Sequence, residues 1–559
     1  RIKGKLPISL KVNWEQDILI FSLISEMGPK EDRKSPSKQP PSNAPQASQE
    51  ETRSSIFDLH STVGQVTFIV VVAAIAVLIQ ALPRDFLSQL LKKDSHEVPV
   101  ASKVPPVQPA VCRHIQEPSY IIYNPRSERE DHLQHVKAVL ERLGFRRAHN
   151  ESKDWDLMWA HDYPFFKLPE LRQLKEHQRV NHFPGSGFLT NKVDLALTES
   201  KYIPKAFRLP EDATKFMEYA KAFPEKEFVQ KNNKHRHIYL KTIPEIDVND
   251  NETFIQEYMT NPFLVDGKKF DIGAYVVVTS IDPLRIYVYH GDYLLRFCPV
   301  EYYPFDRSNL DKYVVGDDYT PTWEIESLEK FHTRMGFSMK DCLDAYVRSL
   351  GKDPRTIWDQ IHDSIREIVL RKESHLVSTL QRYKSRKNFF ELMRFDFIVD
   401  ENLRVFLLEA NMSPNLSSAH FKPNKLLYEQ VIYNALKLVG IGSVVRRESL
   451  KARNADAEAM MSSMKNIAID ADVCASETCS NAVTETCNNE LCQFCRWCLS
   501  KDDLEILHTA YREHTNRGDM LRIYPTGKHD VLDDSSLTPQ NLFMSKWFSE
   551  KCQNDRSWC

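Results

Sequence analysis

Apolar and polar positions alternate most regularly between residues 389 and 418, in the segment FFELMRFDFIVDENLRVFLLEANMSPNLSS. The alternation predicts two strands, at 392–399 and 404–410, joined by a tight turn at residues 400–402. The two strands are expected to pair as an antiparallel hairpin whose side chains point alternately to the two faces of a sheet.

Two acids and an amide lie at corresponding places of this hairpin. Folding about the turn is expected to bring Asp396 roughly opposite Glu409, and Asn411 then shares the face of Glu409. An unpaired carboxylate is costly to bury among apolar residues, so a partner is expected. Oxygen ligands of this kind suit Mg²⁺ carrying the phosphates of a nucleotide. The alternative is a hairpin whose acids pair with Arg394 or Arg404.

Strand-like and helix-like runs alternate over residues 112–440. Helices are expected at 128–143, with Gly144 as the C-cap, and at 211–222, 323–347, 355–381 and 425–439. Strands are expected at 120–123, 155–160, 202–209, 227–231, 237–242 and 253–259. The segments KKFDIGAYVVVTS and LRIYVYHGDYLLRF predict a long pair with a turn at Gly291-Asp292. The pattern is typical of an α+β (α/β) fold with much antiparallel sheet.

Three different segments precede this body. The chain starts with Arg1 and its first methionine is Met27, so residues 1–26 are left out of the fold prediction, and 1–61 is expected to be largely disordered. Segment 62–82 carries no charge and contains FIVVVAAIAVLI, which predicts a single transmembrane helix. Residues 83–111 are expected to form a linker rich in Pro and Val.

Two patterns favour opposite orientations of the body across a membrane. Arg84, Lys92 and Lys93 follow the predicted span, whereas Arg53 precedes it, so the positive-inside rule favours a cytosolic body. Eight of the 11 cysteines lie after residue 470, which favours disulfides and a lumenal body. A zinc site within CNNELCQFCRWC and free thiols are alternatives to disulfides. Residues 441–473 are expected to be a linker or exposed helix, and 474–559 a Cys-rich region.

Charge and motifs exclude several function classes. The formal net charge is −3, so no overall basic field indicates nucleic acid as a partner. The sequence contains no HExxH, GxSxG, Walker A or dinucleotide-binding motif.

Four cations lie where they could meet an anionic ligand. Lys231 ends EFVQK and precedes NNKHRH, a cationic loop that either folds over a triphosphate or is solvated. Lys269 shares a strand face with Asp271, either in a cleft or as a surface ion pair. Arg296, in LLRF, has the same two interpretations, and Lys192 follows the turn PGSG.

Four segments together resemble the tubulin–tyrosine ligase-like family. They are VNHFPGSGFLTNK, FVQKNNKHRHIYLK, IQEYMTNPFLVDGKKFDIGAYVVVTSIDPLRIYVYHGDYLLRF and FELMRFDFIVDENLRVFLLEANMSPNL, and their order and spacing fit over residues 112–440. The resemblance implies an ATP-grasp fold. It also implies ATP-dependent ligation of an amino acid, usually onto a glutamate side chain or the C-terminus of tubulin.

The resemblance further implies roles for individual residues in binding ATP. Lys231 corresponds to a lysine on the ATP phosphates. Gln256 and Tyr258 correspond to the segment that holds adenine. Lys269 and Asp271 correspond to polar residues that line the nucleotide and its ribose.

Other residues are implied in catalysis and metal binding. Lys192 corresponds to a lysine that reaches the phosphates, and Arg296 to an arginine near phosphate or the incoming amino acid. With Lys269, these are the expected catalytic cations. The expected Mg²⁺ ligands are Asp396, Glu409 and Asn411, in agreement with the hairpin argument.

Two departures from the family pattern affect this expectation. The family has an arginine two residues past the aspartate of KFD, where this chain has Gly273. The phosphate loop reads NNKHRHI, where the family usually has glycines. Loss of a cation that faces transition-state charge would raise the barrier to ligation.

The sequence therefore predicts a membrane-anchored ligase that uses ATP and Mg²⁺. Tubulin or microtubules are the expected acceptor and glutamate the expected amino acid. The alternatives are a catalytically impaired relative that binds nucleotide or microtubules, and a ligase that acts on another acidic protein.

Overall fold

The computed structural model describes residues 117–559, except 128, 233–237, 444, 446–454, 481–486, 491 and 528–536. The described residues all belong to one structural unit, Arg113–Cys559. The predicted segments 1–61, 62–82 and 83–111, including the transmembrane helix, lie outside the described residues. Within the described part of the chain, no helix combines the length and the apolar character that a membrane crossing requires.

A small parallel sheet opens the described chain. Its order is β2-β1-β3-β4, and its bounds are Ser119–Tyr123 (β1), Arg146–Arg147 (β2), Leu157–Ala160 (β3) and Arg179–Val180 (β4). Helix α4, Gln134–Arg142, connects β1 to β2. Gly144 follows with a φ of 77°, which confirms the predicted glycine C-cap.

The second sheet has seven strands and is built around the long strand β9, Phe270–Ile281. Strand β13 (Glu391–Val399) pairs with one edge of β9 and also with β14 (Val405–Asn411). Strands β10 (Leu284–Tyr289) and β11 (Leu294–Phe297) follow one another along the other edge. Strand β12, Thr320–Pro321, extends the sheet beyond β11. The mixed α/β fold and the predicted hairpin at 392–410 are confirmed.

The predicted turn at Gly291-Asp292 is wrong. The chain reverses at Asp282-Pro283, between β9 and β10, and Gly291-Asp292 only interrupts the second strand between β10 and β11. Pro283 has no N–H group to donate to a ladder, so a position outside the strands suits it. LRIYVYHGDYLLRF therefore pairs along β9 through its two ends, β10 and β11, with a register shift between Arg285 and Ile286 and a break around Gly291-Asp292.

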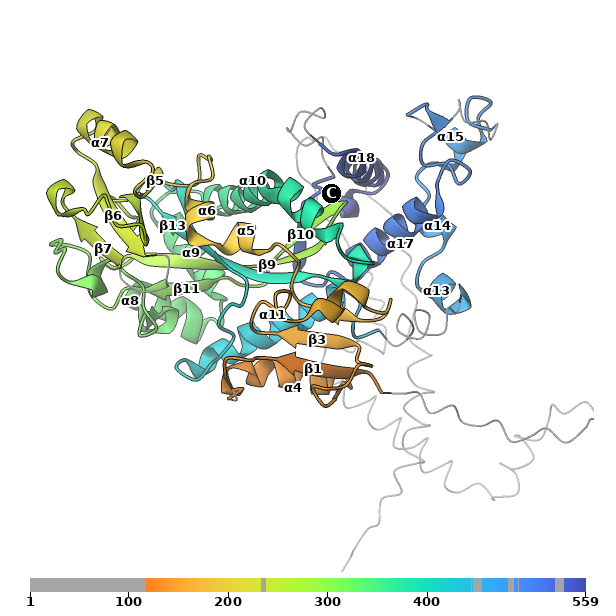
Figure 1. Ribbon diagram of the computed structural model, residues 1–559, viewed down its shortest axis with the longest axis horizontal. Coiled ribbons are helices and arrows are strands. Elements are labelled where there is room, and N and C mark those ends of the chain that lie inside the picture. The colour runs from red at the N-terminus through yellow and green to blue at the C-terminus, as the bar shows by residue number, and fades with distance from the viewer. Residues whose placement is uncertain are drawn as a thin grey trace, which may run out of the picture. The chain divides into compact units, whose positions relative to one another are not determined.

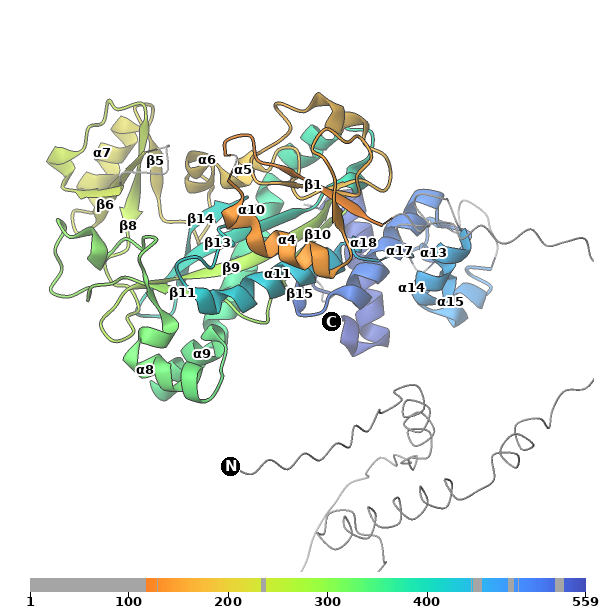
Figure 2. The same cartoon turned by 90° about the horizontal axis from the view of Figure 1, so that it is seen from below.

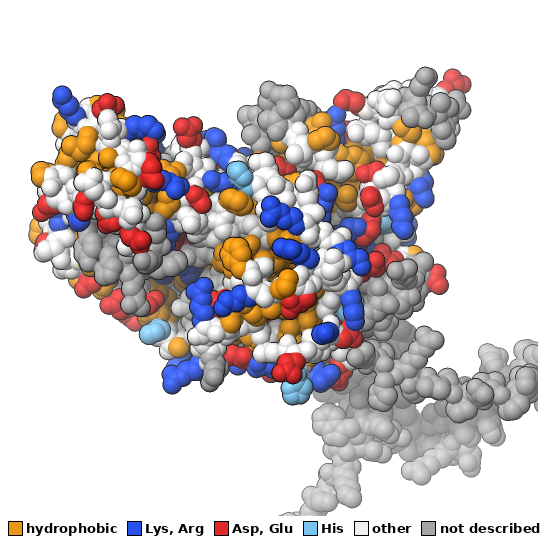
Figure 3. Space-filling view, in the orientation of Figure 1, with side chains coloured by type: hydrophobic (Ala, Val, Ile, Leu, Met, Phe, Trp, Pro, Cys, Tyr) orange, Lys and Arg blue, Asp and Glu red, His pale blue; other side chains and the backbone are white. Residues whose placement is uncertain are grey.

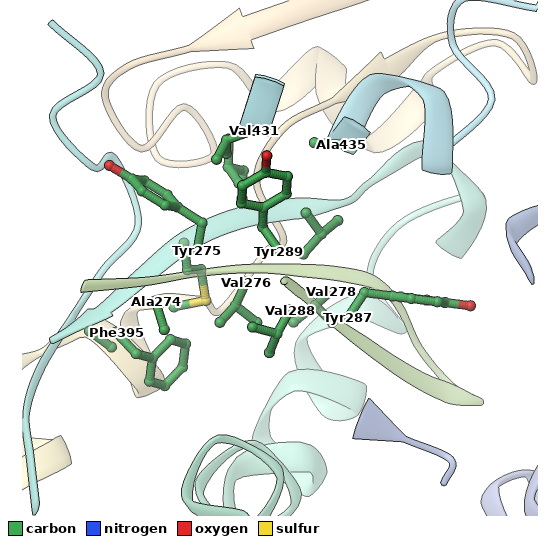
Figure 4. Packing of buried hydrophobic residues seen from close by; sticks show 14 of the residues in the cluster. Ala274, Tyr275, Val276, Val278, Tyr287, Val288, Tyr289, Phe395, Val431 and Ala435 are labelled. Carbon is green, nitrogen blue, oxygen red and sulfur yellow. The ribbon is translucent and has the colours of Figure 1, made fainter. Parts of the chain in front are cut away.

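Residues on the two faces of this sheet pack against different helices. Tyr275 and Tyr289 lie on the side of the sheet that faces Val431 and Ala435, whereas Val276 points to the other side (Figure 4). Helices α11 (Lys425–Leu438) and α10 (Arg355–Leu380) lie on opposite faces in both ribbon views (Figures 1 and 2). Covering both faces explains why the residues of β9, β10 and β13 are nearly all buried.

A third sheet, with four antiparallel strands, carries part of the predicted site. Its order is β5-β8-β6-β7, and its bounds are Ala206–Arg208 (β5), Glu227–Asn232 (β6), Ile238–Lys241 (β7) and Thr253–Tyr258 (β8). Helix α7, Ala213–Ala222, packs through Phe216 on the small core of this sheet. The predicted strand at 202–209 is shortened to its last residues. The cationic loop after Lys231 lies outside the described residues.

Most of the remaining helices are short. Their bounds are Gly187–Thr190 (α5), Lys192–Ala196 (α6), Glu326–Glu329 (α8), Met339–Ser349 (α9), Ala455–Met461 (α13), Met464–Ile467 (α14), Ala471–Ala475 (α15), Lys501–Asn516 (α17) and Pro539–Asn554 (α18). The helix expected over 323–347 is broken into α8, a π-helical turn and α9, because Gly336 takes a φ of 71°.

The C-terminal region joins the central sheet. Strand β15, Met520–Tyr524, pairs antiparallel with the edge of β10. Arg285 on β10 makes a buried two-bond ion pair with Glu513 on α17, with N–O distances of 2.7 and 3.0 Å. The Cys-rich region, which the sequence presents as a separate part, is therefore held to the body by strand pairing and a buried ion pair.

Eight cysteines of this region form four disulfides. The pairs are Cys474–Cys495, Cys479–Cys492, Cys487–Cys498 and Cys552–Cys559. The structure thus favours disulfides over the zinc site and the free thiols that the spacing left open. Among the residues described, no group of three or more His, Cys, Asp or Glu side chains is arranged to hold a metal ion.

Candidate active site

A cavity between the four-stranded and seven-stranded sheets collects nearly all of the predicted site residues. Its walls come from α6, from β6 and β8 of the smaller sheet, and from β9, β11, β13 and β14 of the larger one. The predicted residues among its lining are Lys192, Lys231, Gln256, Tyr258, Lys269, Asp271, Arg296, Asp396 and Glu409. Asn411 lies beside them, in hydrogen-bonding contact with Asp396 and Glu409.

The hairpin brings its two carboxylates together as the sequence predicts. Asp396 and Glu409 are partners across β13 and β14, and the register shifts immediately after them, so that Phe397 faces Leu407. Leu408 is the extra residue of this β-bulge, and in an unshifted register Asp396 would face Leu408 instead of Glu409. The amide nitrogen of Asn411 lies 3.2 Å from Asp396 Oδ2 and 3.1 Å from Glu409 Oε1.

Lys192 connects helix α6 to this hairpin. Its Nζ lies 3.1 Å from Glu409 Oε2. Asn191 caps α6 by accepting hydrogen bonds from the backbone of Val193 and Asp194, which fixes the start of the helix and with it Lys192. Burial alone would raise the pKa of Glu409, but Lys192 and Asn411 outweigh it and lower that pKa to about 2. Glu409 is therefore an anion at neutral pH.

Two arginines share the other carboxylates of the site. Arg296 makes two hydrogen bonds to Asp271, at 2.9 and 2.7 Å, and a third to Asp396, at 3.1 Å. Arg394 also binds Asp396 through two bonds, at 2.6 and 2.8 Å. The alternative pairing of Asp396 with Arg394 is thus present in the structure, whereas Arg404 pairs with Asp400. Burial raises the pKa of Asp271 to about 6 although Arg296 opposes the shift.

Two lysines lie deep in the cavity. Lys231 donates to Gln256 Oε1 at 2.7 Å, and Lys269 donates to the backbone oxygen of Tyr313 at 2.8 Å. Burial lowers the pKa of each lysine to about 8, and for Lys231 the nearby Lys192 adds to the effect. Neither lysine has a carboxylate hydrogen-bond partner among its described contacts. Both are thus suited to binding an added anion.

Cations lie among acids both at the surface and in the cavity. On the face shown in Figure 3, Lys and Arg side chains are interspersed with Asp and Glu side chains. The cavity is lined by Lys192, Lys231, Lys269 and Arg296 and also by Glu257, Asp271, Asp396 and Glu409. Among the described contacts, Lys231 and Lys269 make no hydrogen bond to these acids, and in a desolvated pocket such cations interact more strongly with an added anion than they would in water.

The cavity also has aromatic and apolar walls. The ring of Tyr258 lies 4.9 Å from Lys269 Nζ, and its hydroxyl is 3.2 Å from that of Tyr302. Val229, Ile398 and Leu408 line the same cavity. Gln256 is buried and donates to the backbone oxygen of Pro204 at 3.1 Å. A cavity with apolar and aromatic walls and a few polar groups is the kind of site that accepts a base.

The donors of the hairpin fit a hard divalent cation. Two carboxylates converge on a single amide group, and an amide can turn its oxygen toward the place that its nitrogen now faces. Asp396, Glu409 and Asn411 would hold Mg²⁺ there, and Lys231 and Lys269 would face the phosphates of the nucleotide. When bound, the metal would neutralise charge on the phosphates and orient them.

Sequence reasoning missed one residue that belongs to this site, Arg394. It appeared only as a possible partner that would argue against metal binding. The signal was its position two residues before Asp396, on the same strand face. The alternation along the strand could have placed its side chain among the site residues.

Comparison with known proteins shows the family of this chain. A family model described as the tubulin-tyrosine ligase family matches residues 171–449. The probable tubulin polyglutamylase ttll-15 of Caenorhabditis elegans is 42% identical over 439 residues, which cover 77% of this chain and 84% of that protein. The chain belongs to the tubulin-tyrosine ligase family.

More distant members of the family match a smaller share of the chain. Human tubulin polyglutamylase TTLL7 is 28% identical over 352 residues, covering 58% of this chain and 39% of that protein. Human tubulin monoglutamylase TTLL4 is 30% identical over 304 residues, covering 51% of this chain and 25% of that protein. The family match includes every candidate site residue from Lys192 to Asn411. As a member of the tubulin-tyrosine ligase family, the chain is a ligase.

Proposed function

We propose that this ligase of ATP-grasp type uses ATP and Mg²⁺ to join glutamate to a glutamate side chain of an acidic polypeptide. One observation carries the proposal: Asp396, Glu409 and Asn411 converge at a cavity that also contains Lys231 and Lys269. Oxygen donors suit the metal, and unpaired cations suit the phosphates.

The proposed reaction has two steps. An oxygen of the acceptor carboxylate attacks the γ-phosphorus of ATP, and the bond to the β-phosphate oxygen breaks, giving an acylphosphate and ADP. The amine of free glutamate then attacks the acyl carbon. The carbon–oxygen bond to phosphate breaks, and the amine loses a proton to solvent. Lys192, Lys231 and Lys269 bind and orient the phosphates, and Arg296 helps to hold the anionic reactants.

Tubulin is the first acceptor to test, because the relatives that match this chain are named for acting on it. The expected result is incorporation of labelled glutamate into microtubules that depends on both Mg²⁺ and ATP. The matched variants are Glu409→Gln, which removes one proposed metal ligand, and Glu401→Gln, which changes an exposed acid in the turn of the same hairpin. Label in wild type no higher than in Glu409→Gln would contradict ligation of glutamate onto tubulin.

A second candidate acceptor is an acidic protein of the secretory pathway. The four disulfides of the C-terminal region favour it, since such bonds persist in oxidising compartments. With the predicted membrane span at 62–82, a lumenal body would be separated from cytosolic tubulin. A cytosolic body, favoured by the charges that flank the span, keeps tubulin as the acceptor.

Protease protection separates the two acceptors. Sealed microsomes that contain the full chain are treated with protease, with and without detergent. Protection of the C-terminal tail supports the secretory acceptor and contradicts direct modification of tubulin. Digestion of the tail without detergent supports tubulin.

A further inference from the structure

The path of one arginine side chain depends on a glycine of the neighbouring strand. Gly273 on β9 lies directly opposite Asp396 on β13. A Cβ placed on Gly273 would lie 2.9 Å from Cδ and 3.3 Å from Nε of Arg394, and 3.4 Å from Asp396 Oδ1. The space of the missing side chain is therefore occupied by Arg394.

Arg394 is buried beside the candidate site and joined to it through Asp396. It retains only 6% of its accessible surface, and it lies on β13 opposite Asn411 of β14. Its guanidinium binds both oxygens of Asp396, one of which also accepts hydrogen bonds from Arg296 and Asn411. One proposed metal ligand is thus held by two guanidinium groups and an amide.

Asp396 accepts hydrogen bonds from more donors than it could retain while it also binds a metal ion. A divalent cation held by Asp396 and Glu409 would compete with the arginines for the oxygens of Asp396. Donors of Arg394 released in this way would need another acceptor, because an unpaired buried cation is costly. A phosphate brought in with the metal is an anion that a guanidinium can bind through two parallel bonds.

We propose that Arg394 binds the terminal phosphate of the nucleotide, and that Gly273 lacks a side chain so that Arg394 can reach it. The proposal rests on the function proposed above. The resemblance implied that the site lacks a cation at position 273, and Arg394 provides a cation in that space from the adjacent strand. The cation then comes from β13 instead of β9, so the departure at Gly273 moves a positive charge to the adjacent strand and does not remove it.

The test measures how much more tightly the chain binds ATP than ADP, with Mg²⁺ present, by calorimetry on the purified full chain. Arg394→Gln is expected to reduce the preference for ATP by about tenfold or more, because it removes a charged donor to the terminal phosphate. A second variant combines Gly273→Arg with Arg394→Gly. It returns a guanidinium to the same space from β9 and is expected to recover most of the preference.

Arg285→Gln is the matched control. Arg285 lies in the same sheet, on β10, and is also buried and bound through two bonds to a carboxylate, but its partner is Glu513 of α17 and not a proposed metal ligand. Both single variants are expected to lower the melting temperature, whereas only Arg394→Gln is expected to change the ratio of the two dissociation constants. A change in that ratio is not expected from a structural role alone.

The outcomes separate this inference from the proposed function. An unchanged preference in Arg394→Gln, with wild type binding Mg-ATP, contradicts the role of Arg394 and leaves the ligase proposal intact. If the double variant prefers ATP over ADP no more strongly than Arg394→Gln does, a guanidinium from β9 cannot replace the one from β13, which contradicts this part of the proposal. A wild-type chain that does not bind Mg-ATP contradicts the proposed function itself.

Discussion

Asp396 and Glu409 face one another across the hairpin because a single extra residue, Leu408, shifts the register of β14. β-Bulges re-aim side chains, and here the bulge turns the buried Asp396 and the half-buried Glu409 toward the same amide. The same hairpin also places Arg394 beside Asp396. Acid and base are therefore paired before any ligand arrives, which limits the cost of burying them.

Binding of Mg-ATP is expected to weaken as pH rises through about 8. The pKa values of Lys231 and Lys269 are both lowered to about 8 by burial, so these lysines lose their charge there and not near 10.5. Calorimetric titration of ATP from pH 6.5 to 9.5 measures the change. Affinity that stays constant to pH 9.5 would mean that neither lysine binds phosphate.

The stability of the ligand-free protein, unlike its affinity for Mg-ATP, is expected to rise with pH over part of this range. Between about pH 8 and 10.5 the unfolded chain binds more protons at these lysines than the folded chain, so their contribution to the free energy of unfolding rises with pH. Thermal unfolding of Lys231→Met and Lys269→Met beside wild type isolates this contribution. In each variant, stability is expected to rise less between pH 8 and pH 10 than it does in wild type.

Alkylation should count the disulfides. The chain has 11 cysteines, and the eight that form disulfides leave Cys112, Cys298 and Cys342. In denatured but unreduced protein, peptide mass spectrometry is expected to find Cys298 and Cys342 alkylated and the eight disulfide cysteines unmodified, whereas reduced protein is expected to take up 11 alkyl groups. Uptake of 11 groups without a reductant would contradict the disulfides and remove the support for a secretory acceptor.

The ion pair between Arg285 and Glu513 is expected to hold the C-terminal region to the sheet. Glu513→Gln leaves a buried guanidinium without its charge partner and should lower the free energy of unfolding by about 3–5 kcal/mol. Glu505→Gln, on the same helix, breaks an exposed pair with Lys387 and should cost about 1 kcal/mol or less. Urea denaturation measures both. Equal effects would show that the buried pair does not hold the region in place.

Local sequence patterns were sufficient to predict much of the fold and most of the candidate site. The hairpin of β13 and β14 could be predicted because its partners are close in sequence and its alternation is regular. Lys269 and Asp271 could be placed on one strand face for the same reason. Long α10 and α11 were predicted nearly to their ends because their apolar spacing is sustained over several turns.

Contacts between distant segments could not be predicted in this way. Nothing in the sequence near β10 indicates that β15 pairs with it, because the partner lies more than 200 residues later. The role of Gly273 was also hidden. Its lack of a side chain matters only because Arg394 of another strand passes over it. The position of the turn at Asp282-Pro283 was missed because Gly291-Asp292 is the stronger local turn signal.

The proposed function depends on a metal site that the hairpin presents to a nucleotide in the cavity. The dissociation constant of ATP, measured with and without Mg²⁺ for wild type, Glu409→Gln and Glu401→Gln, tests for this site. Mg²⁺ is expected to tighten binding in wild type and Glu401→Gln, and Glu409→Gln is expected to lose about a hundredfold in Mg-ATP affinity. Equal Mg-ATP affinity in Glu409→Gln and wild type would show that the hairpin holds no such site.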